Sequence, residues 1–458
     1  MDLVAQAAQT IGNQPAIITA EHLWSFDGLD ADTARIAAAF EASGVRRGDI
    51  VALVAPNSAA FVLALMALMR MGAVAAPVNH RFPASHTDVV LARLHPAMRL
   101  DATALEAFVA NALARTDASF TAATEMERPV SVIHTSASSG KPKAALHSLL
   151  NHYWSAKGSA ENLPFGQGDC WLLSLPLYHV GGYSMLYKCL IGGGALAVPP
   201  PEAPLADALA RFPVTHLSLV PTQLYRMLRA DGGPEQLRNL KALLLGGSAV
   251  SAPLLREAIR ERVPLYLTYG STEMSTQVTT SPAPITEVQG DSGVVLQYRE
   301  VSVAPDHEIL VRGKCLFMGY LDDGELREAR DNNGWFHTGD MGELSEDGRL
   351  TVLGRKDSMF ISGGENIHPE EIEKALTSIE GIEEAVVVPA PDAEYGMRPV
   401  AWIKAQSDAP DDAAIITSIK GTLGRFKTPV TFHRIQEWQT IPGSAKIDRG
   451  WYRKLAEK

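Results

Sequence analysis

The sequence predicts an α/β protein with a large N-terminal domain of helix-covered, mostly parallel sheets and a small, mobile α+β C-terminal domain. Through residues 1–350, continuous apolar runs alternate with helical stretches, as in parallel sheets that are buried on both faces. The chain then continues into a tail of about a hundred residues with its own helices and strands, which is an ordinary domain size. A chain of 458 residues is also too long for one ordinary core.

The strand and helix signals alternate along the first domain. "DIVALVAPN" (49–57) predicts a strand, and the apolar segment 61–78 follows it. Arg70 and Gly72 interrupt that segment, so it is too short and too broken to span a bilayer, and we interpret it as a buried helix running into a buried strand. Later runs end in Gly, Pro or Ser and lead into helical segments, at 170–177, 216–222 and 241–249. Ligands of such sheets usually lie beyond the carboxyl ends of the strands, where the polar clusters of this sequence fall.

The tail is expected to form a separate unit. Its predicted elements are a helix from near Pro369, strands at 384–390 and 398–405, a helix near 411–424 and a short strand at 430–435. The predicted division of the chain is an N-terminal domain over 1–354, a hinge over 355–358 and a C-terminal domain over 359–458.

The composition is that of a globular protein with an acidic surface. Of the residues, 46% are hydrophobic and 20% charged, and 41 Lys and Arg against 52 Asp and Glu give a net charge of −11. With no basic run, this argues against nucleic acid or an anionic membrane as the main partner. Three cysteines without metal-type spacing and an N-terminus without a secretory pattern predict a cytoplasmic protein with buried thiols. The oligomeric state, a homo-oligomer included, stays open.

The segment "HTSASSGKPKAAL" (134–146) has the small hydroxyl residues, glycine and lysines of a loop that wraps phosphate. It differs from a Walker A loop, because Thr135 stands at the first glycine position and Pro142 follows Gly140 and Lys141. Pro142 also disfavours helical geometry at Lys141. The segment is therefore predicted to be a turn between two strands. In isolation an ordinary polar hairpin turn is the favoured alternative.

Four further motifs follow in a fixed order, and the series of five is specific although each motif alone is weak. They are "YGSTE" (269–273), "GWFHTGD" (334–340), "GRKDSMFISGGENIHPEEIE" (354–373) and "IPGSAKIDR" (441–449). Over nearly its whole length the chain resembles the adenylate-forming superfamily of acyl-CoA synthetases, peptide-synthetase adenylation domains and beetle luciferases. The resemblance implies two steps. A carboxylate attacks the α-phosphate of ATP to give an acyl-adenylate and pyrophosphate, and a thiol then displaces AMP.

The resemblance implies a phosphate site whose donors and cation act on charge that builds up in the transition state. The residues implied to hold the β- and γ-phosphates are Thr135, Ser136, Ser138, Ser139 and Gly140, with Lys143 as a nearby positive charge. Glu273 would be the Mg²⁺ carboxylate, since Mg²⁺ favours few protein ligands plus phosphate oxygens. Thr272 would touch the α-phosphate.

A nucleoside site is implied as well, by Tyr269, Gly270, Asp340, Arg355 and the turn of Gly246, Gly247 and Ser248. Asp340 would accept both ribose hydroxyls, and Arg355 would reach the ribose or a phosphate. Tyr269 would stack on adenine, and the glycine turn would let the nucleotide approach the backbone. In isolation, an ordinary Gly-Gly turn and a helix-capping Asp are the alternatives.

Lys446 is the implied catalytic lysine of the last motif, which is one residue shorter than in many relatives. Its ammonium would lie between the substrate carboxylate and the α-phosphate and orient the attack. A surface lysine is the alternative. Asp357 is the implied hinge, and the loop of Ser362, Gly363 and Gly364 would admit the pantetheine arm of CoA after the small domain swings.

Two alanines depart from the family pattern. Ala137 and Ala144 stand where relatives usually carry glycine. Because Ala137 adopts positive φ less cheaply than glycine, an extended or right-handed conformation is expected there. The effect of Ala137 on ATP affinity stays open, and activity is expected to be retained.

The acid pocket is expected between the segment 175–190 and the strand that leads to Gly246. His179 would be a gate or wall of the acyl site and is counted with the catalytic residues. A helix-capping or core histidine is the alternative. Longer stretches such as "CWLLSLPLYHVGG" and "HLSLVPTQLYRML" are most similar to the o-succinylbenzoate–CoA ligases of menaquinone biosynthesis.

The substrate of those ligases has an aromatic ring and a second carboxylate. Lys188 is our candidate partner for that carboxylate, and a solvated helix lysine is an equal alternative. Tyr183 and Tyr225 would supply ring contacts, although aromatic residues at such spacing are more often plain core.

The implied activity is that of an AMP-forming acid–CoA ligase that uses ATP, Mg²⁺ and coenzyme A and no prosthetic group. Alternatives are another aryl- or medium-chain acyl-CoA ligase, an adenylation domain that loads a carrier protein, and a luciferase-like oxygenase. A non-catalytic nucleotide-binding relative is opposed by Glu273, Asp340 and Lys446.

Overall fold

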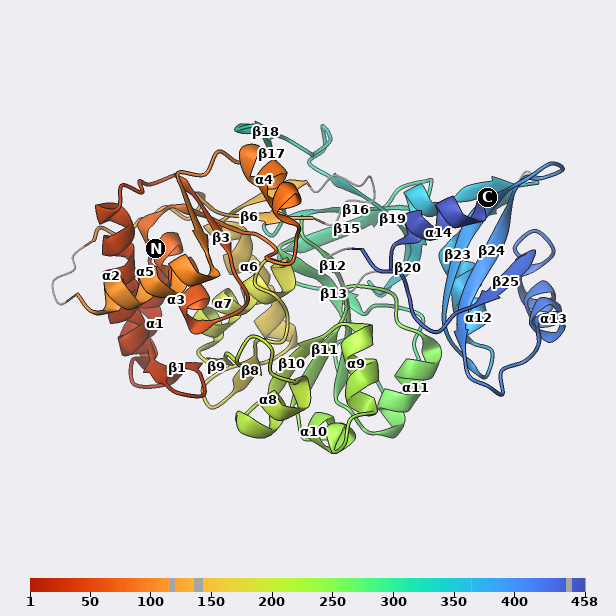
Figure 1. Ribbon diagram of the computed structural model, residues 1–458, viewed down its shortest axis with the longest axis horizontal. Helices are drawn as coiled ribbons and strands as arrows, with labels where there is room; N and C mark the ends of the chain where they lie inside the picture. Colours follow the sequence, from red (N-terminus) through yellow and green to blue (C-terminus); the bar gives the residue numbers. More distant parts are fainter. Residues whose placement is uncertain (116–119, 136–142, 364, 442–446, 458) are drawn as a thin grey trace.

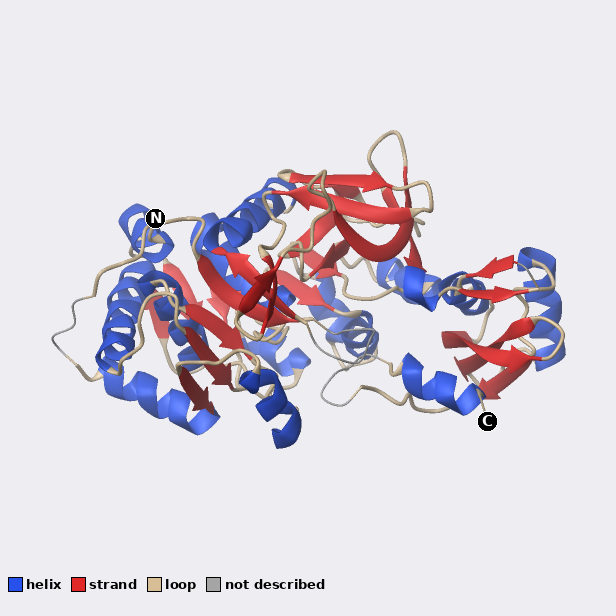
Figure 2. Cartoon of the chain, turned by 90° about the horizontal axis from the view of Figure 1, so that it is seen from above, coloured by secondary structure: helices blue, strands red, loops and turns tan. Residues whose placement is uncertain are grey.

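The computed structural model describes residues 1–115, 120–135, 143–363, 365–441 and 447–457. The strands of these residues form four sheets, three within 15–355 and one within 360–434. Figure 1 shows the fourth sheet in blue at one end of the long axis, and Figure 2 shows it with its own helices from above. The predicted fold class, a large N-terminal α/β domain followed by a smaller C-terminal domain, is confirmed.

The first sheet has nine described strands, in the order β14-β13-β12-β11-β10-β8-β9-β1-β2. Strands β1 and β8 to β12 run parallel to one another, and antiparallel pairs form only towards the two edges, between β1 and β2 and from β12 to β14. The strands are β1 Pro15–Ile18, β2 Leu23–Ser25, β8 Cys170–Leu172, β9 Ala195–Ala197, β10 His216–Leu219, β11 Ala242–Leu245, β12 Leu265–Ser271, β13 Thr276–Thr280 and β14 Val294–Val295.

The second sheet has seven described strands, in the order β18-β17-β7-β6-β4-β3-β5. The strands β5, β3, β4 and β6 are parallel, and β7, β17 and β18 add antiparallel pairs at one side. The strands are β3 Ile50–Val54, β4 Val74–Pro77, β5 Met98–Asp101, β6 Pro129–His134, β7 Ala144–Ser148, β17 Gly319–Asp322 and β18 Glu325–Arg327.

The third sheet departs from the expected alternation of strands and helices. Its strands β15 Arg299–Val303, β16 Glu308–Gly313, β19 Phe336–Leu344 and β20 Leu350–Arg355 are all antiparallel. After α11 (Ala252–Arg260), no helix is found among the described residues up to 355, so the expected alternation through residue 350 is wrong for this part. The reason lies in the side chains, because these strands mix buried and exposed positions, as antiparallel sheets with one wet face do.

The C-terminal unit follows the predicted order of elements. Its sheet joins β21 Phe360–Ser362, β22 Glu365–Ile367, β23 Ile382–Asp392, β24 Gly396–Ala405 and β25 Thr431–Arg434, and its helices are α12 Pro369–Thr377, α13 Asp412–Leu423 and α14 Arg449–Ala456. The predicted α12, α13, β23, β24 and β25 are confirmed. The short strands β21 and β22 and the last helix were not predicted.

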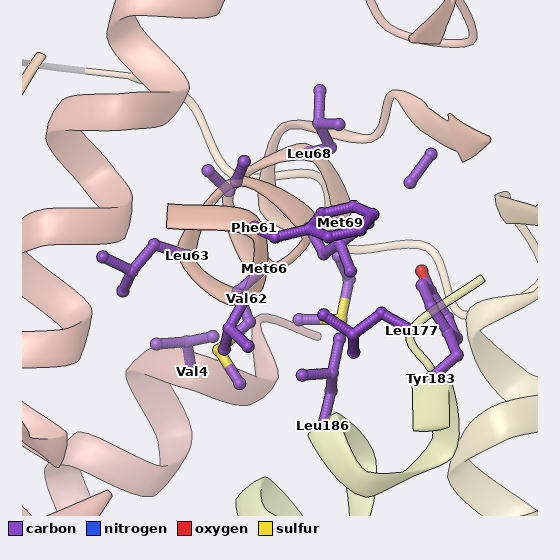
Figure 3. Packing of buried hydrophobic residues seen from close by; sticks show 14 of the residues in the cluster. Val4, Phe61, Val62, Leu63, Met66, Leu68, Met69, Leu177, Tyr183 and Leu186 are labelled. Carbon is purple, nitrogen blue, oxygen red and sulfur yellow. The ribbon is translucent and has the colours of Figure 1, made fainter. Parts of the chain in front are cut away.

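Helices cover the first two sheets, and the helix α3 (Ala59–Met71) is buried along nearly its whole length. The helices of the large domain are α1 Leu3–Ile11, α2 Phe26–Ala42, α3 Ala59–Met71, α4 Ala84–Ala92, α5 Ala102–Leu113, α6 Leu149–Asn162, α7 Val180–Gly192, α8 Leu205–Arg211, α9 Pro221–Leu228, α10 Gly233–Arg238 and α11. Figure 3 shows Phe61, Val62 and Met66 of α3 packed between Val4 of α1 and Leu186 of α7. The prediction of a buried helix running into a buried strand is therefore confirmed.

Two further expectations can be compared with the structure. No helix of the described residues is both long and apolar enough to cross a membrane. Cys170, Cys189 and Cys315 are buried free thiols, as predicted. Burial raises the pKa of the Cys170 thiol to about 12, so this group stays in the inert thiol form.

Arg70 is accommodated in the apolar helix α3 because its guanidinium is fully paired. Its side chain is only 5% exposed. Nε donates to Asp2 Oδ2 at 2.9 Å, Nη1 donates to the Asp30 carbonyl at 2.7 Å and to Thr33 Oγ1 at 2.8 Å, and Nη2 pairs with the Asp30 carboxylate. A single buried cation thus ties the N-terminus and α2 to α3.

We predict that Arg70→Ala lowers the free energy of unfolding by about 3–5 kcal/mol, because it leaves buried acceptors without a partner. Urea denaturation followed by tryptophan fluorescence measures the change. The matched control is Arg93→Ala, whose ion pair with Asp322 is half-exposed and worth about 0–1 kcal/mol. Equal losses in the two variants would contradict the role of Arg70.

Candidate functional site

The phosphate-loop segment connects two antiparallel strands. Strands β6 and β7 pair with His134 opposite Ala144, and the Thr135 amide donates to the Lys143 carbonyl at 2.9 Å. The prediction that this segment lies between two strands, in place of the strand–loop–helix of a Walker motif, is confirmed. Ser136, Ala137, Ser138, Ser139 and Gly140 lie outside the described residues.

Lys143 and Glu273 are linked through Tyr320. The Tyr320 hydroxyl donates to Glu273 Oε1 at 2.6 Å, and the Lys143 ammonium lies 4.9 Å from the centre of the same ring. Burial, together with the charge of Glu273, raises the pKa of Tyr320, so the hydroxyl stays protonated and acts as the donor. Tyr320 comes from β17, a segment in which the sequence analysis assigned no functional residue.

Strand β12 ends in the Thr272–Glu273 turn. A bulge between Tyr269 and Gly270 interrupts its pairing with β13, and a Cβ on Gly270 would lie 1.9 Å from the Thr276 carbonyl oxygen, so only glycine fits. The Thr272 carbonyl is held by Nε2 of buried His147 at 2.8 Å. Burial lowers the pKa of His147 to about 4, which keeps this histidine neutral at physiological pH.

Asp340 is held by two side chains from other strands. Its Oδ2 accepts the Tyr269 hydroxyl at 2.6 Å, and its Oδ1 accepts Arg355 Nη1 at 2.9 Å. Burial, followed by the charge of Asp340, raises the pKa of Tyr269 well above its usual value. Burial lowers the pKa of Arg355, but Asp357 and Asp340 outweigh it and raise that pKa overall. Each carboxylate oxygen keeps capacity for a further donor, such as a ribose hydroxyl.

The turn after β11 has no room for side chains at its first glycine. A Cβ on Gly246 would lie 2.6 Å from Thr268 Cγ2 and 2.9 Å from the Thr268 carbonyl oxygen. Gly247 has a φ of +87°, which favours glycine. With Ser248, this turn lies at the carboxyl end of β11, which is parallel to β12, so it shares an edge of the sheet with Tyr269 and Thr272.

The proposed acid-pocket residues lie in three different surroundings. His179 is exposed at the N-cap of α7 and contacts the Tyr178 ring, so the alternative of a core histidine is wrong. Tyr183 is fully buried and packs with Leu177 in the core cluster of Figure 3. The Tyr225 hydroxyl donates to Glu383 Oε2 at 3.1 Å, so this residue contacts the C-terminal sheet.

Lys188 is buried, and the alternative of a solvated helix lysine is wrong. Its ammonium donates to Gln277 Oε1 at 3.0 Å and lies 4.5 Å from the centre of the Trp171 ring. No carboxylate pairs with it among the described residues. Burial, with a smaller contribution from the like charge of Arg299, lowers the pKa of Lys188 to about 7.

A small, mostly apolar cavity adjoins Lys188. It is lined by Ala156, Ser159, Ala160, Leu163, Phe165, Trp171 and Lys188. Neither Tyr183 nor Tyr225 lines this cavity. Gln277, the amide partner of Lys188, was missed by the sequence analysis because only the fold brings β13 against α7.

The predicted hinge residue Asp357 lies in a short 3₁₀ helix, η1 Lys356–Ser358, and pairs with Arg355 Nε at 3.1 Å. Glu370 of α12 packs on the preceding strand, where a Cβ on Gly354 would lie 2.5 Å from its Oε2. Burial raises the pKa of Glu370. A single short segment thus joins the two parts of the chain.

In the predicted CoA loop, Ser362 is fully buried and its hydroxyl has no partner among the described residues. Gly363 has a φ of +58°, and a Cβ there would lie 2.4 Å from the Phe426 ring. Gly364 and the predicted catalytic Lys446 lie outside the described residues.

The described residues supply little of a metal site by themselves. They contain no cluster of three or more His, Cys, Asp or Glu residues that could hold an ion. Glu273 offers a half-buried carboxylate with a spare oxygen near Lys143. Mg²⁺ bound with a nucleotide takes most of its ligands from phosphate and water, so one such carboxylate fits it.

The chain is similar to known proteins over nearly its whole length. Among curated relatives, the 2-succinylbenzoate–CoA ligase of Salmonella typhimurium is 36% identical over 441 residues, covering 96% of this chain and 93% of that protein. The o-succinylbenzoate CoA synthetase of Bacillus subtilis in complex with its acyl-adenylate intermediate is 29% identical, with a TM-score of 0.87 and coverage of 99% and 98% of the two chains. The same synthetase in complex with ATP and a magnesium ion gives 28% identity, a TM-score of 0.85 and coverage of 98% of both.

Two family models match the two parts of the fold. The model for the C-terminal domain of AMP-binding enzymes matches residues 371–442. The model for the AMP-binding enzyme itself matches residues 3–321, well over half of the chain. The chain therefore belongs to the family of AMP-binding enzymes.

Proposed function

We propose that this chain is an ATP-dependent ligase that joins 2-succinylbenzoate to coenzyme A with release of AMP and pyrophosphate. The observation that carries the choice of acid is Lys188, a buried ammonium whose described partners are a neutral amide and an indole face. A buried cation of this kind is completed by an anionic ligand group. 2-Succinylbenzoate has one carboxylate to activate and a second one for Lys188. The curated 2-succinylbenzoate–CoA ligases that cover nearly the whole chain support the assignment.

The reaction has two displacement steps. In the first, a carboxylate oxygen of the acid bonds to the α-phosphorus of ATP while the bond to the bridging oxygen breaks, and pyrophosphate leaves with that electron pair. In the second, the thiol of CoA loses its proton and its sulfur bonds to the acyl carbon. The carbon–oxygen bond to the adenylate then breaks, and AMP leaves.

In this proposal, each group acts on charge that develops at the phosphates. The loop Thr135, Ser136, Ser138, Ser139 and Gly140 with Lys143 holds the departing pyrophosphate, and Thr272 contacts the α-phosphate. Lys446 orients the attacking carboxylate, and His179 forms a wall of the acyl site. The Tyr269, Asp340 and Arg355 cluster holds the nucleoside beside the Gly246–Ser248 turn, which is supported by the hydrogen bonds that already converge on Asp340.

Glu273 is the proposed protein ligand of Mg²⁺, which when bound with ATP neutralises phosphate charge. Tyr320 keeps this carboxylate in place through its 2.6 Å hydrogen bond. In this proposal the protein's part is therefore to present one oriented carboxylate next to the cation of Lys143.

The domain division at 355–358, with Asp357 as the pivot, is part of the same proposal. After adenylation the small domain rotates and brings Ser362, Gly363 and Gly364 to the site for the pantetheine arm. The substrates are small molecules, and the net charge of −11 makes nucleic acid an unfavourable partner. Three free thiols fit a cytoplasmic enzyme.

We predict that a panel of carboxylic acids offered with ATP, Mg²⁺ and CoA gives the fastest pyrophosphate release with 2-succinylbenzoate. Acids that lack the second carboxylate leave Lys188 without an anionic partner and should be at least about 100-fold worse in kcat/KM, since an unpaired buried charge costs several kcal/mol. Faster turnover of a simple aryl or medium-chain acid would contradict the choice of substrate but not the ligase chemistry. Transfer to a phosphopantetheinyl carrier protein and not to free CoA would contradict the choice of acceptor.

Lys446→Ala is predicted to abolish formation of the acyl-adenylate, because the ammonium that orients attack is lost. Thioester formation from preformed acyl-adenylate should remain close to that of the wild type. The two half-reactions are measured separately, as pyrophosphate release and as CoA consumption. Lys454→Ala, a change at an exposed lysine of α14, is the control. Equal loss of both half-reactions would contradict the role.

The KM for 2-succinylbenzoate is predicted to rise with pH above neutrality. Because the pKa of Lys188 is lowered to about 7, the ammonium form is dominant below pH 7 and falls about tenfold per pH unit above it. KM for the acid should rise between pH 7 and 9 as the ammonium form is lost, while KM for ATP should stay constant. Initial rates at saturating ATP, with the acid concentration varied at each pH, measure KM for the acid.

Lys188→Arg is the matched variant for this pH profile, because the guanidinium stays charged over the whole range and should flatten it. Lys188→Ala should raise KM for the acid at every pH and leave KM for ATP unchanged. A wild-type KM for the acid that is independent of pH would contradict the assignment of Lys188 to the acid pocket.

A further inference from the structure

A buried carboxylate lies behind the part of β19 that carries Asp340. Glu308 begins β16, and its side chain is only 8% exposed. Its Oε1 accepts the backbone N–H of Gly339 at 3.0 Å. Its Oε2 accepts Lys356 Nζ at 2.8 Å and lies 3.2 Å from His337 Nδ1. The two oxygens of one carboxylate thus bind two different segments.

The first segment, Thr338 and Gly339, sets the position of the Asp340 side chain. Gly339 has a φ of +71°, and a Cβ there would lie 2.8 Å from Arg355 Nη2, so the chain passes close beneath the guanidinium. Thr338 Oγ1 donates to the Ile309 carbonyl at 2.7 Å and accepts the Asp340 N–H at 3.0 Å. Thr338 and Glu308 together fasten this part of β19 to β16.

The second segment is the start of the hinge. Lys356 directly follows Arg355, and its ammonium also donates to Asp306 Oδ2 at 2.8 Å. The backbone that carries the Arg355 side chain is therefore held in two ways. Arg355 pairs with Asp340 between strands β19 and β20, and the next residue, Lys356, is held by its side-chain contacts.

The charges around Glu308 keep it ionised. Burial raises its pKa, but hydrogen bonds from Lys356, His337 and the Gly339 amide outweigh burial and lower the pKa below its usual value. The other ionisable groups in contact with this cluster are Asp306, which shares Lys356, and Asp331, which faces His337 Nε2 at 3.5 Å. A carboxylate that is ionised and buried is a strong acceptor for a backbone N–H.

We infer that Glu308 is a positioning residue of the nucleotide site, which fixes the part of β19 that presents Asp340 and the segment that presents Arg355 without itself touching the nucleotide. The inference rests on the proposed function, because it takes Asp340 and Arg355 as nucleotide-binding groups. It adds a residue from β16, outside every motif on which the nucleotide site was predicted.

The test compares nucleotide affinity with acid affinity in the full-length enzyme. Glu308→Ala should weaken AMP binding about tenfold, because Gly339 of β19 loses its hydrogen bond to a charged acceptor. Glu308→Gln keeps an acceptor for the Gly339 N–H but not the charge, and should weaken AMP binding about threefold. KM for the acid should not change in either variant, because Lys188 and its cavity are formed by α6, the segment that follows it, β8 and α7, and not by β16 or β19. Calorimetry measures AMP binding, and pyrophosphate release at saturating ATP measures the acid KM.

The matched control is Glu300→Ala, which removes an exposed carboxylate on the neighbouring strand β15 that pairs only with Arg312 in the described residues. It should leave both constants unchanged. Unchanged AMP affinity in the Glu308 variants overturns the inference. So does a rise in acid KM by the same factor, since that is the result of general destabilisation. If Glu308→Ala does not fold, the isosteric Gln variant decides by the same criteria. AMP binding is measured without turnover, so a failure of the ligase assignment shows separately, as wild-type enzyme that releases no pyrophosphate with any acid.

Discussion

The Asp340 carboxylate, held between the Tyr269 hydroxyl and the Arg355 guanidinium, is the contact on which the arrangement of this site depends. Tyr269 belongs to the nine-stranded sheet, whereas Asp340 and Arg355 belong to the four-stranded antiparallel sheet. The contact therefore joins two sheets of the large domain at the point where the chain leaves for the C-terminal unit. Partial burial strengthens both hydrogen bonds, because fewer water molecules compete for the charges. A ligand that binds to this carboxylate therefore contacts the point where the two sheets meet and where the segment 355–358 begins.

A second constraint comes from buried cations that have no carboxylate partner among the described residues. Arg299 satisfies its guanidinium with backbone carbonyls of Gln277, Gln297 and Ser155, so its charge is solvated by the chain itself. Lys188 has only the Gln277 amide and the Trp171 ring. Burying an ammonium with so few partners is unfavourable, as its lowered pKa reflects. In the proposed acid pocket, an acid with a second carboxylate offsets that cost and an acid with a neutral tail does not, so Lys188 would provide affinity for the first class of acid and discrimination against the second.

Local sequence patterns predicted what depends on neighbouring residues. The apolar segment at 61–78, the two paired strands that flank the phosphate-loop segment and the elements of the tail from Pro369 onward are confirmed, because each is set by periodicity or by a breaker residue. The ordered motifs predicted that Tyr269, Asp340 and Arg355 act in one site, and the structure brings these three together. Periodicity failed from β13 to β20, where half-buried antiparallel strands carry no helix between them. Tyr320, Gln277 and Glu308 were missed, because each matters only through a partner 47, 89 or 31 positions away in the sequence.

The segment 355–358, the proposed pivot between the two domains, is held by ion pairs and differs in this from a flexible glycine-rich tether. Arg355, Lys356 and Asp357 are charged rather than glycine-rich, and each forms an ion pair in the described orientation. Side chains of this segment are about half-exposed, and pairs of that kind are worth only about 0–1 kcal/mol each. In the proposed rotation about Asp357, Asp340 and Glu308 keep their pairs with Arg355 and Lys356, because these residues lie on the large-domain side of the pivot. The few kcal/mol of differential binding that a ligand supplies are enough to select between two orientations that differ by contacts of this size. In the proposed two-step reaction, exchange of pyrophosphate for CoA is such a change of ligand.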